Sequence, residues 1–110
     1  MRIVYKTKKL EKSLTDEKEL IRKYGQRAKK IKQRRKELEA AENLFIFSKI
    51  PQARLHPYSG DRSGEWSVDI LKNWRLFIEI SQNPIPVFED GSIDLAKVTT
   101  IEIISVEDPH

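Results

Sequence analysis

The sequence predicts an α+β fold with two N-terminal helices packed on a small, mostly antiparallel sheet. A segment from about residue 7 to 41 is rich in Lys, Glu, Leu, Arg and Ala, which is typical of helix. Short apolar segments separated by Pro, Gly and Asn fill the second half of the chain, as in a set of strands and turns. The expected element order is β-α-α-β-β-β. At 110 residues, the chain is expected to form a single domain, 1–110, with one small core.

The first strand and the helices follow from local signals. Ile3–Tyr5 is rich in β-forming residues and predicts a short strand. Asp16 followed by Glu19 has the form of a capped helix start, and Gly25 suits a C-terminal cap. Two helices are therefore expected to meet near Tyr24–Gly25. Their apolar faces are expected to consist of Leu10, Leu14, Ile21 and Tyr24 in the first, and Ala28, Ile31, Leu38 and Ala41 in the second.

Three later segments predict strands. Trp66–Ile70 alternates between apolar and polar residues, and Arg75–Ile80 is expected to pair with it as a hairpin. Thr100–Val106 predicts the last strand. The apolar run Leu44–Phe47 is expected to pack the helices against the sheet. Residues 83–99 contain two prolines and one glycine, which predicts an excursion between the last two strands.

Charge is distributed unevenly along the chain. Residues 1–36 hold 15 basic and 4 acidic residues, whereas residues 37–110 hold 6 basic and 13 acidic residues. The basic half, with Arg27, Lys30 and Arg34 on one side of the second helix, indicates a surface for a polyanion. A solvated helix surface or an acidic protein partner explains the same asymmetry.

Composition also limits the class of protein. The chain has no cysteine, so disulfides and thiolate chemistry are excluded. The start, Met1–Lys6, is too quickly charged for a signal peptide or a membrane span, so a cytoplasmic protein without a membrane partner is expected.

The most informative residues lie in the middle of the chain and at its end. Residues 54–68 read RLHPYSGDRSGEWSV, residues 73–77 read NWRLF, and the last three residues are Asp108-Pro109-His110. This ordered set resembles the HigB branch of the RelE/ParE toxin superfamily, whose pattern is L-H-P or L-H-E, G-D-R, G-x-W-S and N-x-R before an apolar strand. The resemblance covers most of the chain, and the excursion at 83–99 is similar to that of a longer subgroup. It implies a RelE-like fold, in agreement with the predicted element order.

The resemblance also implies a reaction. Cleavage of RNA through its 2′-OH needs a base, a proton donor and cations that neutralise the phosphorane, and imidazole and arginine suit these roles. In HigB-like toxins the corresponding residues line the mRNA site, which implies catalytic roles for His56, Arg75, Asp108 and His110. The activity implied is metal-independent, cofactor-free and ribosome-dependent endonucleolytic cleavage of mRNA by the toxin of a type II toxin-antitoxin system, which inhibits translation.

Further residues are expected to bind RNA or its phosphates, namely Arg54, Arg62, Trp74, Arg27, Lys30 and Arg34. Structural roles compete with these functional ones. His56 before Pro57 also fits a loop histidine bonded to the backbone, and Asp61-Arg62 fits a structural salt bridge. Arg75 also fits a strand residue held in an ion pair.

The implied partners are a cognate helix-turn-helix antitoxin, the ribosome and mRNA, with DNA bound only through the antitoxin complex. Two positions depart from the family pattern: Ser59 stands where many members have Lys, and Pro109 where they often have an aromatic residue. Each departure removes a group that could contact RNA. The alternatives are therefore a non-enzymatic relative such as a ParE-like gyrase inhibitor, or an inactive toxin fold that binds only its antitoxin or nucleic acid.

Overall fold

The computed structural model describes residues 1–109, so the expected role of His110 lies outside the described residues. The helices and strands, in chain order, are β1 (Arg2–Tyr5), α1 (Lys8–Thr15), α2 (Glu17–Tyr24), α3 (Ala28–Ala40), α4 (Leu44–Phe47), β2 (His56–Pro57), β3 (Glu65–Asp69), β4 (Arg75–Ile80) and β5 (Thr100–Glu107). None of the helices in this part of the chain is long and apolar enough to span a membrane.

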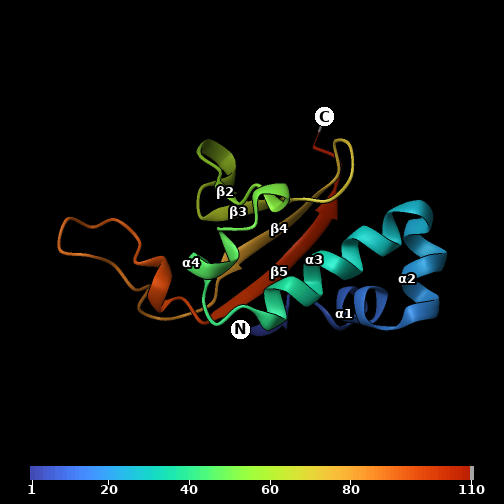
Figure 1. The fold of residues 1–110 in the computed structure, drawn as a ribbon, viewed down its shortest axis with the longest axis horizontal. Coiled ribbons are helices and arrows are strands. Elements are labelled where there is room, and N and C mark those ends of the chain that lie inside the picture. The colour runs from blue at the N-terminus through green and yellow to red at the C-terminus, as the bar shows by residue number, and fades with distance from the viewer. Residues whose placement is uncertain (110) are drawn as a thin grey trace.

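The strands form one five-stranded sheet in the order β1-β5-β4-β3-β2. β1 runs parallel to β5, and the other neighbours are antiparallel. Figure 1 shows α1, α2 and α3 together beside β5, while the loop between β4 and β5 extends in the opposite direction. The predicted α+β fold, with helices packed on a mostly antiparallel sheet, is confirmed.

The N-terminal helical segment contains one more break than expected. Asp16 has an extended backbone, and its side chain accepts a hydrogen bond from the Glu19 amide at 3.1 Å, so that α2 begins anew after α1. Gly25 ends α2 with φ of 54°, a conformation that favours glycine, which confirms the junction expected there. The segment therefore forms three helices rather than two.

The break at Asp16 also changes which side of α2 is buried. Ile21 was expected on the apolar face, but it is 54% exposed, whereas Leu20 is 2% exposed. The expectation for Ile21 is wrong because a helix that restarts at residue 17 does not continue the periodicity of α1. Burial of Tyr24 agrees with its expected place on the apolar face.

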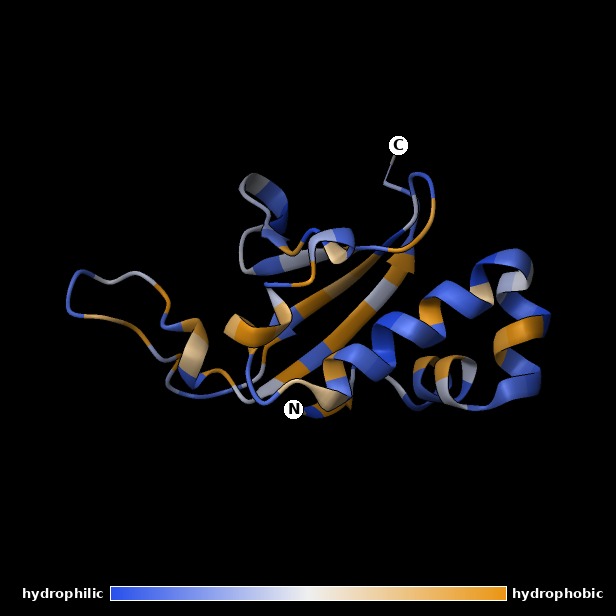
Figure 2. Cartoon of the chain, in the orientation of Figure 1, coloured by the Kyte–Doolittle hydropathy of each residue, from blue (hydrophilic) through white to orange (hydrophobic). Residues whose placement is uncertain are grey.

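The core lies between the helices and one face of the sheet. α4 contributes Leu44 and Phe47, as expected for an apolar run that joins the helices to the sheet. In Figure 2 hydrophobic and polar residues form successive bands along β5. The N-terminal ammonium of Met1 donates to the carbonyls of Glu39 and Ala41 at 2.8 and 2.6 Å, which anchors β1 at the C-terminal end of α3.

A bulge in β5 determines which side chains reach the other face of the sheet. Phe77 pairs with Ser105 but Ile78 pairs with Ile103, so Ile104 is an extra residue. Before the bulge, Ile103 points into the core. After the bulge the alternation shifts by one residue, and Ser105 and Glu107 point away from the helices. We call this side of the sheet, away from the helices, the open face.

Candidate active site

A row of paired residues crosses the open face. His56 of β2 pairs with Ser67 of β3, Ser67 pairs with Phe77 of β4, and Phe77 pairs with Ser105 of β5. Directly opposed residues in a sheet point to the same side. Arg75 is two residues before Phe77 in β4 and therefore also points to the open face. The sheet thus brings His56 and Arg75, two of the expected catalytic residues, onto one surface.

Phe77 forms an apolar centre on this face. Its side chain is fully buried although it lies on the face of the sheet that points away from the helices. The ring of Tyr58 contacts it edge-on, with centroids 5.2 Å apart and an interplanar angle of 86°. The guanidinium carbon of Arg62 lies 3.6 Å from the Phe77 centroid. Two polar residues of the β2–β3 region therefore cover this phenylalanine.

His56 is held at the edge of this centre. Its ring stacks on Tyr58 with centroids 5.3 Å apart and an interplanar angle of 24°. Its Nδ1 lies 2.9 Å from the carbonyl oxygen of Arg54. Because a carbonyl oxygen can only accept, this bond assigns the proton to Nδ1 and leaves Nε2 of the neutral ring as an acceptor. The backbone contact expected of a loop histidine is therefore present.

Arg75 is oriented by one carboxylate and by backbone. Its Nε lies 3.1 Å from Asp69 Oδ1, and its NH1 group donates to the carbonyls of Lys72 and Trp74 at 3.1 and 3.2 Å. The Arg75 side chain is 15% exposed. Arg54 reaches the other oxygen of Asp69 at 3.5 Å, and its side chain is 69% exposed. Two guanidinium groups therefore share one carboxylate, so these three side chains together carry a net positive charge.

Arg62 is bound by two carboxylates. Its NH1 and NH2 groups donate to both oxygens of Glu107 at 3.0 and 2.9 Å, and NH2 also donates to Glu65 at 2.9 Å. The expected salt bridge of Arg62 is present, with Glu65 and Glu107 as its partners rather than Asp61. The hydrogen bonds that Arg62 donates to Glu107 and, to a smaller extent, to Glu65 raise its pKa above the ordinary value.

Glu107 is correspondingly stabilised as a carboxylate. The hydrogen bond from Arg62 is the largest cause, and the Ser105 hydroxyl adds a second bond at 2.6 Å. Both lower the pKa of Glu107 from its ordinary value of 4.5. Glu107 also pairs with Arg75 in the register of the sheet. Asp108, an exposed residue, follows directly, so the C-terminal tail starts beside Arg75.

This pair predicts a pH dependence of stability. Because the pKa of Glu107 is lower in the folded protein, its stabilisation is fully present above about pH 4.5 and is lost as the pH falls through the lowered value. Thermal unfolding of the wild type and of Glu107→Gln measures this effect. We expect the wild type to be the more stable at about pH 6 and the difference to shrink toward about pH 3. A difference that is constant across this range would contradict the prediction.

The expected stripe on the second helix is partly wrong. Arg34 is 2% exposed, its Nε donates to the Asp69 carbonyl at 2.9 Å, and its NH1 group pairs with Glu37 at 2.8 Å. Its guanidinium thus joins α3 to the end of β3 and is not available on the surface for a polyanion. Lys30 and Arg27 are partly exposed.

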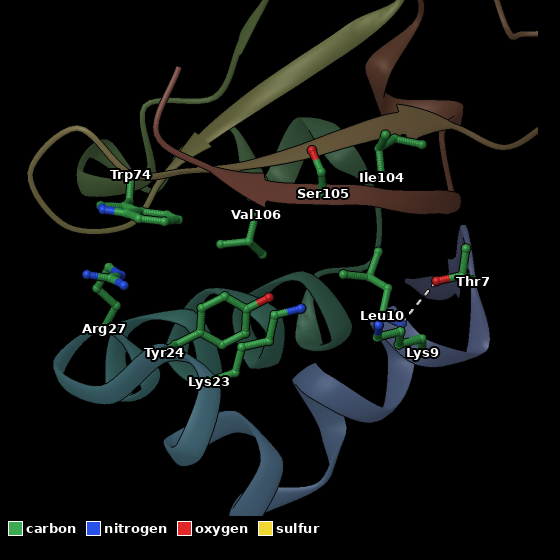
Figure 3. A pocket seen from close by; sticks show the side chains of 10 residues that line it. All are labelled: Thr7, Lys9, Leu10, Lys23, Tyr24, Arg27, Trp74, Ile104, Ser105 and Val106. Carbon is green, nitrogen blue, oxygen red and sulfur yellow. Dashed lines mark hydrogen bonds between the residues drawn. The ribbon is translucent and has the colours of Figure 1, made fainter. Parts of the chain in front are cut away.

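Trp74 and Arg27 lie on the helical side of the sheet. The Arg27 guanidinium carbon is 4.0 Å from the centroid of the Trp74 ring. They line an open groove of about 490 Å³ between the helices and β5. Figure 3 shows Val106 pointing into this groove and Ser105 pointing the other way, in agreement with the bulge. Trp74 is therefore on the opposite side of the sheet from His56.

Sequence reasoning missed several residues of the open face. Tyr58 and Phe77 could have been found, because each lies two residues after a predicted site residue on a strand or its extension. Asp69, which orients Arg75, faces it in the register of the predicted hairpin. Glu107 could not have been found in this way, because unbroken alternation from Ile101 and Ile103 places it toward the core.

A solved structure supports the fold. The chain is similar to the YoeB/ParE toxin from Agrobacterium tumefaciens over 100% of both chains, with a TM-score of 0.57 and 16% sequence identity. At this identity the similarity establishes the architecture: the chain has the α+β fold of a YoeB/ParE toxin. No protein-family model matches the sequence, and neither does any curated protein.

Proposed function

We propose that this protein is the toxin of a type II toxin-antitoxin system, of the HigB branch, and that it cleaves mRNA on the ribosome. The observation that carries the proposal is the placement of His56 and Arg75 on one open face, beside the start of the C-terminal tail. These residues belong to separate parts of the motif that resembles HigB. The toxin fold of the similar structure supports the same class.

In the proposed reaction, Nε2 of His56 removes the proton from the 2′-OH of the substrate RNA. The 2′-oxygen attacks the adjacent phosphorus, the bond to the 5′-oxygen breaks, and a proton passes to that oxygen. The products are a 2′,3′-cyclic phosphate and a 5′-hydroxyl end. Arg75, assisted by the exposed Arg54, stabilises the negative charge that develops on the phosphorane.

The C-terminal residues complete the proposed site. Protonated His110 gives its proton to the leaving 5′-oxygen, and Asp108 favours that protonated form by its negative charge. The imidazoles of His56 and His110 thus act as base and acid in one turnover. No metal ion or cofactor takes part in this scheme.

The proposed partners follow from the same assignment. A helix-turn-helix antitoxin neutralises the toxin, and DNA is contacted only through the complex of the two. Lys30 of α3 and Arg27, which directly precedes this helix, face ribosomal RNA in the cytoplasm. Arg34 is excluded from this surface by its burial.

Two observations favour a second candidate, an inactive toxin fold that binds only its antitoxin. The open face holds the carboxylates of Glu65, Asp69 and Glu107, and Ser59 stands where many HigB-like proteins have a lysine. These features lower the positive charge available to a phosphate. A measurement of activity in cells separates the two candidates.

Induced expression without an antitoxin is expected to arrest growth, because cleavage of translated mRNA stops protein synthesis. Co-expression of the adjacent helix-turn-helix protein is expected to restore growth. Growth curves with immunoblots of the soluble fraction measure both effects. Unimpaired growth at confirmed soluble expression would favour the inactive fold.

A further inference from the structure

Arg62 has contacts that distinguish it from the other arginines of the open face. Its terminal nitrogens donate to both oxygens of Glu107 and to Glu65, and its guanidinium covers the Phe77 ring. Its side chain is 28% exposed. Arg54, in contrast, is 69% exposed and reaches its one acidic partner at 3.5 Å. The two arginines of the same motif therefore have different surroundings.

The charges around Arg62 disfavour phosphate binding. Two carboxylates surround one guanidinium, so the cluster carries a net charge of about −1 near neutral pH. A phosphate could use the bidentate geometry of Arg62 only by displacing Glu107, which already occupies it. Glu107 is itself held by the Ser105 hydroxyl at 2.6 Å. Phosphate neutralisation is thus left to the other arginines of the face.

The same contacts connect two distant parts of the proposed site. One path runs from Arg62 through Glu107 to the C-terminal tail, across 45 residues of sequence. The other runs from Arg62 over Phe77 to Tyr58, whose ring stacks on His56. Arg62 therefore contacts both Glu107, which precedes the C-terminal tail, and Phe77, which packs against the Tyr58 ring beside His56.

We infer that Arg62 is a positioning residue, which fixes the His56 ring and the base of the C-terminal tail relative to each other, and that Glu107 is its essential partner. This inference rests on the proposed function for the reaction concerned. It assigns to Arg62 a role different from the phosphate contact expected from the sequence. It also gives Glu107 a role that the resemblance to HigB does not include.

Two substitutions separate positioning from phosphate binding. Arg62→Lys keeps the positive charge but cannot span two carboxylates and a ring. We expect it to lower kcat for RNA cleavage by about 10²-fold, the effect of a small misplacement of reacting groups, with little change in RNA affinity. Glu107→Gln removes one negative charge and frees the guanidinium. We expect it to lower kcat but to raise RNA affinity, with a steeper dependence on salt.

A direct phosphate contact predicts a different pattern. Loss of the Arg62 guanidinium in Arg62→Gln would then weaken RNA binding and reduce the salt slope by about one. Glu107→Gln would leave kcat unchanged or raise it. Either result overturns the positioning role.

A structural readout makes the test independent of activity. The chain has two histidines, so the imidazole NMR signals are few and can be assigned with a variant that lacks His110. We expect Arg62→Lys and Glu107→Gln to shift or broaden the His56 signals in the folded protein. The matched control is Arg22→Lys with Glu19→Gln, an arginine–glutamate pair on α2 at 2.6 Å whose side chains are 70% and 32% exposed. It is expected to leave these signals and kcat unchanged.

The outcomes separate this inference from the proposed function. If the wild type cleaves no RNA but the His56 signals change in Arg62→Lys, the contacts between Arg62 and His56 through Phe77 and Tyr58 are supported and the proposed reaction is wrong. If the wild type cleaves RNA and Arg62→Lys preserves both kcat and the His56 signals, the positioning role is wrong. Glu107→Gln alters a side chain that is 39% exposed and opens no cavity, so it provides a folded variant even where Arg62→Lys unfolds.

Discussion

Replacement of His56 by alanine is expected to lower the rate of mRNA cleavage by about 10²–10⁴-fold, the usual effect of losing an acid–base group. The bond from Nδ1 to the Arg54 carbonyl leaves Nε2 as the proton acceptor, and no neighbouring group in the proposed scheme replaces it. Single-turnover cleavage of ribosome-bound mRNA measures the effect.

The matched control for this prediction is His56→Asn. Its side-chain amide can donate to the Arg54 carbonyl but cannot remove a proton near neutral pH. We expect His56→Asn to be as inactive as the alanine variant and to keep its antitoxin affinity. Substantial cleavage by the asparagine variant would show that His56 supports the loop and is not the base.

Replacement of Arg75 by alanine is expected to lower cleavage by about 10²–10³-fold, as for a lost stabiliser of transition-state charge. Arg75 is held by Asp69 and by two carbonyls, so its guanidinium is oriented before substrate binds. Arg75→Lys should recover a small part of the rate, because it restores charge but not the planar group. Arg22→Ala, on the exposed side of α2, serves as the control. Equal rates for Arg75→Ala and this control would remove Arg75 from the proposed site.

The sequence predicted the strands better than the helices. Alternation in Trp66–Ile70 and the turn after it were enough to predict the β3–β4 hairpin, and hence the neighbourhood of Arg75. In the helical segment, Asp16 was correctly predicted to begin a helix. A separate helix, α1, ending just before it was not expected. A capping residue inside a continuous run of helix-forming residues shows only that a start is possible.

The charged residues show a second limit of sequence reasoning. Arg34 belongs to a run of basic residues, and the composition of this run predicts a solvated surface. The Arg34 side chain is nevertheless buried, with Asp69 and Glu37 as its hydrogen-bond partners. Asp69 lies 35 residues away in the sequence, and only tertiary packing brings it to Arg34. Glu107 reaches the open face only because of the bulge at Ile104. The motif therefore indicated the candidate site, whereas the contacts that hold it together required the structure.

Mapping mRNA 5′ ends after brief induced expression of the wild type and of His56→Ala tests the proposed nuclease activity most directly. The proposed function predicts new 5′-hydroxyl ends within translated regions for the wild type, their loss when translation initiation is blocked, and none for His56→Ala. Growth arrest without such ends, or ends that persist in His56→Ala, would contradict a ribosome-dependent nuclease site on the open face.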